Sequence, residues 1–164
     1  MNSVTTRLRV QVSFALRRLF MTLACLAIVT TAGLATAASA APGGGTIIIR
    51  NDRGGSLGER GDLIRRLRAT GQRVELRGTC LSACTMYLGL SNICVAPSAR
   101  LGFHGPTRNG RKLSHEDFDH WSWVMARNYN APLQSWYMEK ARFRTSGYYQ
   151  LSGAELIRMG YPSC

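Results

Sequence analysis

The chain has 164 residues, of which 45% are hydrophobic, and its formal net charge is +12. This length is typical of one globular domain and argues against two. The basic residues are mostly arginine and lie scattered, with no run of five like charges, so a solvated basic face is favoured over a nucleic-acid surface. An anionic surface or substrate in the cell envelope is the alternative partner.

The first forty residues have the pattern of a secretory signal peptide. Four arginines precede an uncharged apolar run at residues 19–34, and small residues at 38–40 fit a signal peptidase site. We therefore expect cleavage after Ala40 and a periplasmic or secreted protein, which excludes nucleic acid as a partner. A retained membrane anchor is one alternative. A lipoprotein signal ending at Cys25 is another, although few apolar residues precede that cysteine.

The mature chain begins with a linker and a βα unit. Residues 41–45 form a Pro/Gly linker, and the β-branched run at 46–50 predicts a buried strand. Ser56 and Glu59 have the spacing of a capping box, which predicts a helix that ends at Gly71.

A second unit follows directly. Alternation over residues 73–77 predicts a second strand, and a tight turn at Ser82 opens a helix that runs to about Leu90. Residues 93–96 and 100–104 read as extended segments. A β-α-β-α-β order this tight predicts an α/β fold, with a parallel sheet and right-handed crossovers.

This order brings a serine and a histidine toward one edge of the sheet. Ser82 follows the second strand, and His104 lies at the end of a later extended segment. The Gly54-Gly55 loop follows the first strand and should lie at the same edge, where open α/β folds place their sites. The N–H groups of Gly55 and Ala83 are the candidate donors to a developing oxyanion.

The cysteines of the mature chain are Cys80, Cys84, Cys94 and Cys164. An even number in an oxidising compartment favours two disulfides, for which three connectivities exist. We favour pairing Cys80 with Cys84 and Cys94 with Cys164. A zinc site at Cys80-x-x-x-Cys84 lacks a second closely spaced pair, so no metal is expected.

Three stretches together resemble a known family. Residues 51–56, 78–84 and 96–106 are similar to the Clp protease proteolytic subunit and its crotonase-fold relatives, and most of all to exported Clp-protease-like proteins of proteobacteria. The resemblance covers residues 46–106 well and residues 130–161 loosely. It implies one domain over residues 46–164, built as a spiral of β-β-α and βαβ units.

The resemblance also implies roles for individual residues. Ser82 corresponds to the nucleophile, His104 to its base, and Gly55 with the amide of Ala83 to the oxyanion hole. No aspartate stands where the third triad member is expected, near Arg144 or Glu139. We take Glu139 as the candidate orienting acid.

Asp117 and Asp119 are the alternative candidates for that orienting acid.

The strand and helix that precede the glycine loop in the family are missing here, because only a linker precedes Thr46. The core is therefore shortened at the N-terminus or completed by another subunit, which predicts a homo-oligomer.

Residues 113–137 are rich in aromatic side chains. Ser114 and Asp117 should cap a helix that runs to about Asn128 and packs on the sheet. A subunit interface or a hydrophobic substrate wall is the alternative role for this face. His115 and Asp119, four residues apart, predict a surface ion pair in preference to a metal site.

Two functions follow as hypotheses. The first is a periplasmic serine hydrolase acting on peptide, ester or thioester bonds through a Ser-His dyad or incomplete triad, without a cofactor. The second is a catalytically inactive module of the same fold that binds an envelope partner or forms oligomers. The sequence has no Gly-x-x-x-x-Gly-Lys loop, so ATP-driven unfolding would need a partner.

Overall fold

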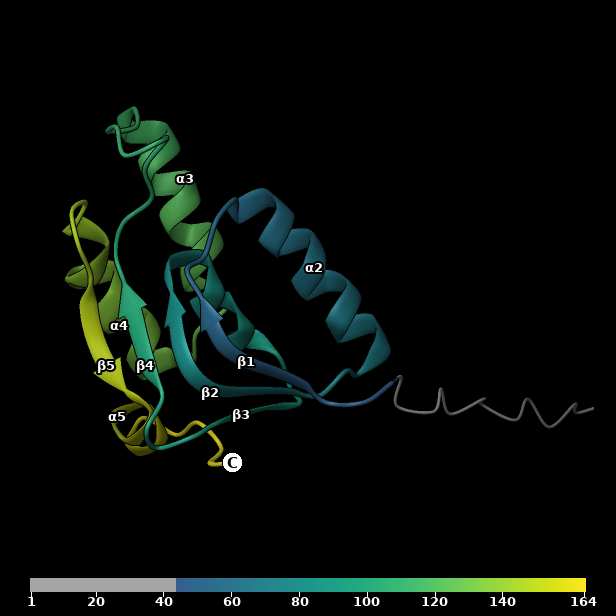
Figure 1. Ribbon diagram of the computed structural model, residues 1–164. Helices are drawn as coiled ribbons and strands as arrows, with labels where there is room; N and C mark the ends of the chain where they lie inside the picture. The colour runs from purple at the N-terminus through teal and green to yellow at the C-terminus, as the bar shows by residue number, and fades with distance from the viewer. Residues whose placement is uncertain (1–43) are drawn as a thin grey trace, which may run out of the picture. The chain divides into compact units, whose positions relative to one another are not determined.

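The computed structural model describes residues 44–164, which form an α/β domain. The predicted signal peptide and the first residues of the predicted linker lie outside this range. Within it, no helix is both long and apolar enough to cross a membrane. A five-stranded sheet has the order β1-β2-β4-β5, with β3 paired to β2 (Figure 1).

The strands are β1 Ile47–Asp52, β2 Val74–Leu81, β3 Ile93–Val95, β4 Arg100–Phe103 and β5 Tyr149–Ser152. The α-helices are α2 Leu57–Thr70, α3 His115–Ala126, α4 Ala131–Glu139 and α5 Gly153–Arg158. Two 3-10 helices complete the described elements, η2 Ser82–Gly89 and η3 Ala141–Phe143.

Helix α2 begins and ends as predicted. The Ser56 side chain accepts a hydrogen bond from the Glu59 N–H, and Gly71 ends the helix in the left-handed conformation. Ile64 and Leu67 are buried beneath the helix. Because α2 starts immediately after the glycine loop, its first turn lies at the carboxyl edge of the sheet.

Strand β2 is the centre of the sheet and is longer than predicted. Its parallel partner on one side is β1. Its other side pairs first with β3, through Val74 to Leu76, and then with β4, through Thr79 to Leu81, both in parallel. The end of β2 is therefore aligned with the end of β4, which fixes where the residues after each strand meet.

The sheet is mixed, not wholly parallel as predicted. Strand β5 runs antiparallel to β4, with Phe103 opposite Tyr149, and the two strands lie beside each other in Figure 1. The parallel pairing is confirmed for the strands predicted between residues 46 and 104. The sequence pattern predicted no strand at β5, which follows the aromatic helices outside the alternating βα pattern. The remaining pairings of the sheet are parallel.

The aromatic segment packs against the sheet. Phe103 on β4 is fully buried, and its ring meets the rings of Tyr129 and Trp136 edge to face, at centroid distances of 5.7 and 5.5 Å. Helix α3 is capped by Ser114 as predicted, although it ends at Ala126. These contacts support the interpretation that the aromatic residues are mainly core.

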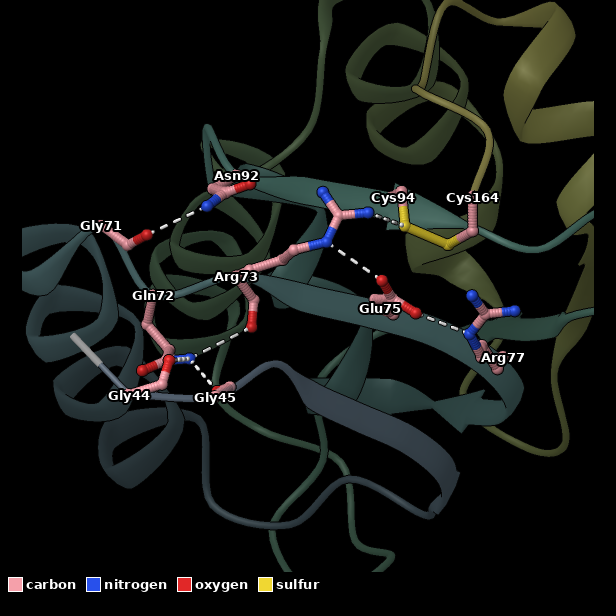
Figure 2. A network of polar contacts seen from close by, with 10 residues as sticks. All are labelled: Gly44, Gly45, Gly71, Gln72, Arg73, Glu75, Arg77, Asn92, Cys94 and Cys164. Atoms are coloured by element: carbon pink, nitrogen blue, oxygen red, sulfur yellow. Dashed lines mark hydrogen bonds and ion pairs between the residues drawn. A yellow bond between two sulfur atoms is a disulfide. The ribbon is translucent and has the colours of Figure 1, made fainter. Parts of the chain in front are cut away.

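Both predicted disulfides are present, Cys80–Cys84 and Cys94–Cys164. The second fastens the C-terminal residues to β3, where the Cys164 N–H also donates to the carbonyl of Val95. Figure 2 shows the polar network around it.

In this network Arg73 donates to Cys94 Sγ, at 3.3 Å, and to Glu75, at 3.0 Å. Arg77 binds the other oxygen of Glu75 at 2.6 Å. Hydrogen bonds from Arg77 and Arg73 lower the pKa of Glu75, which therefore stays ionised between the two arginines at neutral pH.

Candidate active site

Ser82 occupies a strained turn between β2 and η2. Its φ angle is +55°, a left-handed conformation that is uncommon for residues other than glycine. The Cys80–Cys84 disulfide closes a ring around this residue. The Thr85 hydroxyl also donates to the Ser82 carbonyl at 2.7 Å. The predicted helix is a 3-10 helix over its whole length, Ser82–Gly89.

His104 follows β4 and lies against the serine. Its Nε2 atom is 2.7 Å from Ser82 Oγ, so the predicted meeting of the two side chains is confirmed. The alignment of Leu81 with Gly102 across β2 and β4 brings them together. When Nε2 accepts this hydrogen bond, the serine hydroxyl is the donor, as a general base requires.

The histidine environment favours the neutral imidazole. His104 is partly buried, and this burial lowers its pKa below the usual 6.5. Among the described residues, no carboxylate forms a hydrogen bond or ion pair with it. A neutral ring at pH 7 is able to accept a proton from Ser82.

The glycine loop lies directly on the serine turn. A Cβ atom on Gly54 would stand 2.7 Å from the Leu81 carbonyl oxygen and 2.8 Å from Ser82 Cβ, and the φ angle of Gly54 is +95°. Only glycine permits this approach and this conformation together. The predicted placement of this loop beside Ser82 is therefore confirmed.

The loop offers one N–H group to the candidate oxyanion hole. The Gly54 N–H is used, since it donates to Asp52 Oδ1 at 2.8 Å. The Gly55 N–H makes no hydrogen bond within residues 44–164. Ala83 is in the first turn of η2, where N–H groups have no partner within the helix. Gly55 and Ala83 thus stay the candidate donors.

Asp52 also connects the loop to α2, which sequence reasoning missed. Its Oδ2 atom binds Arg60 at 2.7 Å, and both side chains are largely shielded from solvent, at 19% and 11% exposed. The Arg60 guanidinium lies over the Tyr87 ring at 4.6 Å from its centre. Asp52 stands two residues before Gly54, the spacing of an Asx turn, and that signal was available in the sequence.

The chain after His104 is held by the segment that precedes β5. The Gly105 N–H donates to the Arg144 carbonyl at 2.8 Å, and the Tyr137 hydroxyl donates to the His104 carbonyl at 3.2 Å. The Tyr148 ring meets the imidazole edge to face, with centroids 4.9 Å apart. Backbone and aromatic contacts thus hold the histidine and the chain that follows it.

The structure does not bring Glu139 to His104. Glu139 is an exposed residue at the end of α4, with no side-chain hydrogen bond or ion pair among the described residues. Asp119 instead binds Arg142 at 2.8 Å, and it also lies 3.3 Å from His115, in agreement with the predicted surface pair. Neither acid is therefore seen as the third member of a triad.

The remaining acid candidate is engaged elsewhere. Asp117 lies 3.6 Å from the guanidinium of Arg108, on the loop between β4 and α3. Arg144, near the position where the resemblance expects an acid, places its guanidinium over the Tyr149 ring at 4.2 Å. The described residues therefore contain a serine-histidine pair without an acid bound to it.

A groove begins at the glycine loop. It has a volume of about 590 Å³ and is lined by Gly55, the first turn of α2, the loop after Pro106, and the side of Trp121. An apolar hollow of about 390 Å³ lies on the other side of Pro106, against Phe118 and Phe143.

The described residues contain one group of potential metal ligands, Glu75 with Cys94 and Cys164. The two cysteine sulfurs are joined in a disulfide, and Glu75 is held by arginines, so these residues do not fit a metal ion.

Comparison with known proteins finds no family model that matches the chain and no curated protein that resembles it.

Proposed function

We propose that the protein is a serine hydrolase of the Clp-protease and crotonase type that cleaves peptide bonds outside the cytoplasm. The observation that carries this proposal is the 2.7 Å contact between Ser82 Oγ and His104 Nε2. A serine held in a left-handed turn, beside a neutral imidazole and two free N–H groups, has the parts that acyl transfer needs.

The reaction follows from this geometry. Ser82 Oγ attacks the substrate carbonyl carbon while His104 Nε2 takes the hydroxyl proton. The carbonyl oxygen gains the negative charge and accepts hydrogen bonds from the Gly55 and Ala83 N–H groups. His104 then gives its proton to the leaving amine as the carbon–nitrogen bond breaks. A water molecule, activated by the same imidazole, hydrolyses the acyl-enzyme and regenerates Ser82.

The rate of this dyad should be modest. Each oxyanion donor contributes roughly 3 kcal/mol to stabilising the intermediate. An acid that orients the histidine of a full triad is worth about 10⁴ in rate. Here Tyr148 and the backbone of Arg144 restrict the imidazole and its loop without neutralising the charge that the imidazole gains. We therefore infer a slow, selective hydrolase.

The wider assignment rests on compartment and fold. Two disulfides support an oxidising environment such as the periplasm, in keeping with the signal peptide expected in the first forty residues. The mostly parallel sheet, with a serine after β2 and a histidine after β4, supports a Clp-protease-like spiral.

A fluorophosphonate probe tests the proposal on protein purified from cells that express the full chain. We expect one covalent adduct per chain, mapped by mass spectrometry to Ser82. The Ser82→Ala and His104→Ala variants should lose it. Ser135→Ala and His120→Ala are matched controls and should label as the wild type does, since both residues are exposed and away from the pair. Folded protein that takes up no probe would refute the proposal.

The absence of a carboxylate bound to His104 within residues 44–164 favours a second candidate, an inactive binding module of the same fold. This candidate predicts that Ser82→Ala retains every partner that the wild type captures. It also predicts that changes at the aromatic face, such as Trp123→Ala, weaken capture, because Trp123 is 54% exposed. Probe labelling at Ser82 decides between the two candidates.

A further inference from the structure

The groove at the glycine loop has an unequal distribution of charge. It runs from Gly55, which follows the Gly54 that packs on Ser82, to the loop that follows Pro106, two residues after His104, so a substrate that extends from Ser82 past the glycine loop enters it. Among the described residues that line it, Arg108 carries the only formal charge. Arg108 therefore gives the groove a positive charge.

The positive character continues along the loop. A second hollow of about 400 Å³ shares Arg108 with the groove and adds Arg111 and Lys112. Asp117 is its acidic residue, and it faces Arg108 at 3.6 Å with both side chains well exposed, at 45% and 72%. So long and exposed a pair is weak, which leaves the Arg108 guanidinium able to bind a second carboxylate.

The opposite wall of the groove adds to this field. Helix α2 begins there with Leu57, and N–H groups of a first turn have no partner within the helix. Ser56 caps only the Glu59 N–H. The amino end of the helix thus presents partial positive charge to the same space that Arg108 lines.

The groove also has an apolar side that suits a peptide more than a small anion. Leu113 and Trp121 line it together with Pro106. The backbone and apolar side chains of a peptide can contact this wall, while Arg108 binds one carboxylate. Arginine forms paired hydrogen bonds with carboxylates, which gives such a contact direction as well as charge.

We propose that the hydrolase selects acidic peptides, and that Arg108 is the specificity-determining residue that binds a substrate carboxylate beside the scissile bond. This inference rests on the proposed function of Ser82 and His104. The carboxylate has two sources, an aspartate or glutamate side chain or the free C-terminus of the peptide. The first makes the protein an acid-selective endopeptidase, and the second makes it a carboxyl-terminal peptidase.

Binding to the Ser82→Ala protein tests the inference without cleavage. Calorimetry would compare N-acetylated hexapeptides that are identical except for Glu, Gln or Lys at one position, each made with a free and an amidated C-terminus. We expect one carboxylate to raise the affinity about fivefold, the scale of a single exposed charge contact. Higher affinity for the Glu peptide would show that Arg108 binds a side-chain carboxylate. Higher affinity for the peptide with a free C-terminus would show that Arg108 binds the terminal carboxylate.

Adding Arg108→Ala to the Ser82→Ala protein should remove the gain in affinity that a carboxylate gives, and Arg108→Lys should keep part of it. Arg66→Ala is the matched control, because it removes the same charge from an exposed position in the second half of α2. Raising NaCl from about 0.05 to about 0.5 M should reduce the gain in affinity in the Ser82→Ala protein and leave the affinities of the Arg108→Ala variant unchanged. Equal binding of the Glu, Gln and amidated peptides, or a gain that survives Arg108→Ala, would overturn the inference.

The same peptides offered to the wild type separate this inference from the proposed function. Cleavage or probe labelling at Ser82 without a preference for a carboxylate overturns the selectivity alone. If a carboxylate raises the affinity but the wild type neither reacts with the probe nor cleaves the peptides, the hydrolase proposal is overturned. Arg108 is then the anion contact of a binding module.

Discussion

The two disulfides should make different contributions, one mainly to stability and one mainly to reactivity. Cys94 and Cys164 are 70 residues apart in sequence, whereas Cys80 and Cys84 are separated by 4. In the chain-entropy model, the stabilisation grows with the logarithm of the loop length. The long loop then contributes about 4 kcal/mol to the free energy of unfolding and the short loop about 2 kcal/mol.

Their effects on Ser82 should follow the opposite order. The short disulfide encloses Ser82, whose left-handed backbone costs roughly 1–3 kcal/mol and needs a surrounding constraint. Opening that ring lets the turn relax, and a relaxation of about 1.4 kcal/mol lowers the population of the reactive geometry about tenfold. The long disulfide lies at β3 and the C-terminus, in the network of Figure 2.

Double alanine variants of each disulfide would be studied by urea unfolding and by the rate of fluorophosphonate labelling. Alanine avoids a hydroxyl at Cys80 and Cys84, which are fully buried. We expect the Cys94/Cys164 variant to lose more stability and, at a urea concentration where it is folded, to label at the wild-type rate. The Cys80/Cys84 variant should lose less stability and label about tenfold more slowly. The reverse order in either measurement would refute this reasoning.

Three further outcomes follow. Because burial lowers the pKa of His104, labelling should depend on one ionisation with an apparent pKa below 6.5 and should fail as the pH drops through it; a midpoint above 6.5 contradicts the assignment. Asp52→Ala should cost about 2 kcal/mol in urea unfolding and slow labelling, whereas Asp52→Asn, which keeps an acceptor for Gly54, should cost less; equal effects would show that this hydrogen bond is unimportant. Glu139→Gln should label at the wild-type rate across the pH range, and a tenfold loss would reinstate Glu139 as the orienting acid.

The serine-histidine pair was predictable because each residue follows a predicted strand, and the ends of parallel strands meet at one edge of the sheet. Small residues around Ser82 predict a turn after a strand, and parallel strands place such turns at one edge. His104 then had to lie at the end of a neighbouring strand. The pairing of β4 with the end of β2 supplies this neighbour. Gly54 and Gly55 were predictable for the same reason.

Other features were not predictable because they depend on contacts between distant segments. The prediction of Glu139 rests on sequence spacing alone, which carries no information on which way the end of α4 faces. Strand β5 is four residues long and pairs antiparallel to β4, a partner that its own pattern does not identify. The edge-to-face contact of Tyr148 with His104 likewise depends on that pairing.

A crystal structure of the protein after reaction with a fluorophosphonate would test the proposed roles of Ser82 and His104. We expect phosphorus bonded to Ser82 Oγ, with the phosphoryl oxygen accepting hydrogen bonds from the Gly55 and Ala83 N–H groups and His104 Nε2 still within hydrogen-bond distance of the adduct. An adduct on another residue, or a phosphoryl oxygen directed into solvent away from the glycine loop, would contradict these roles.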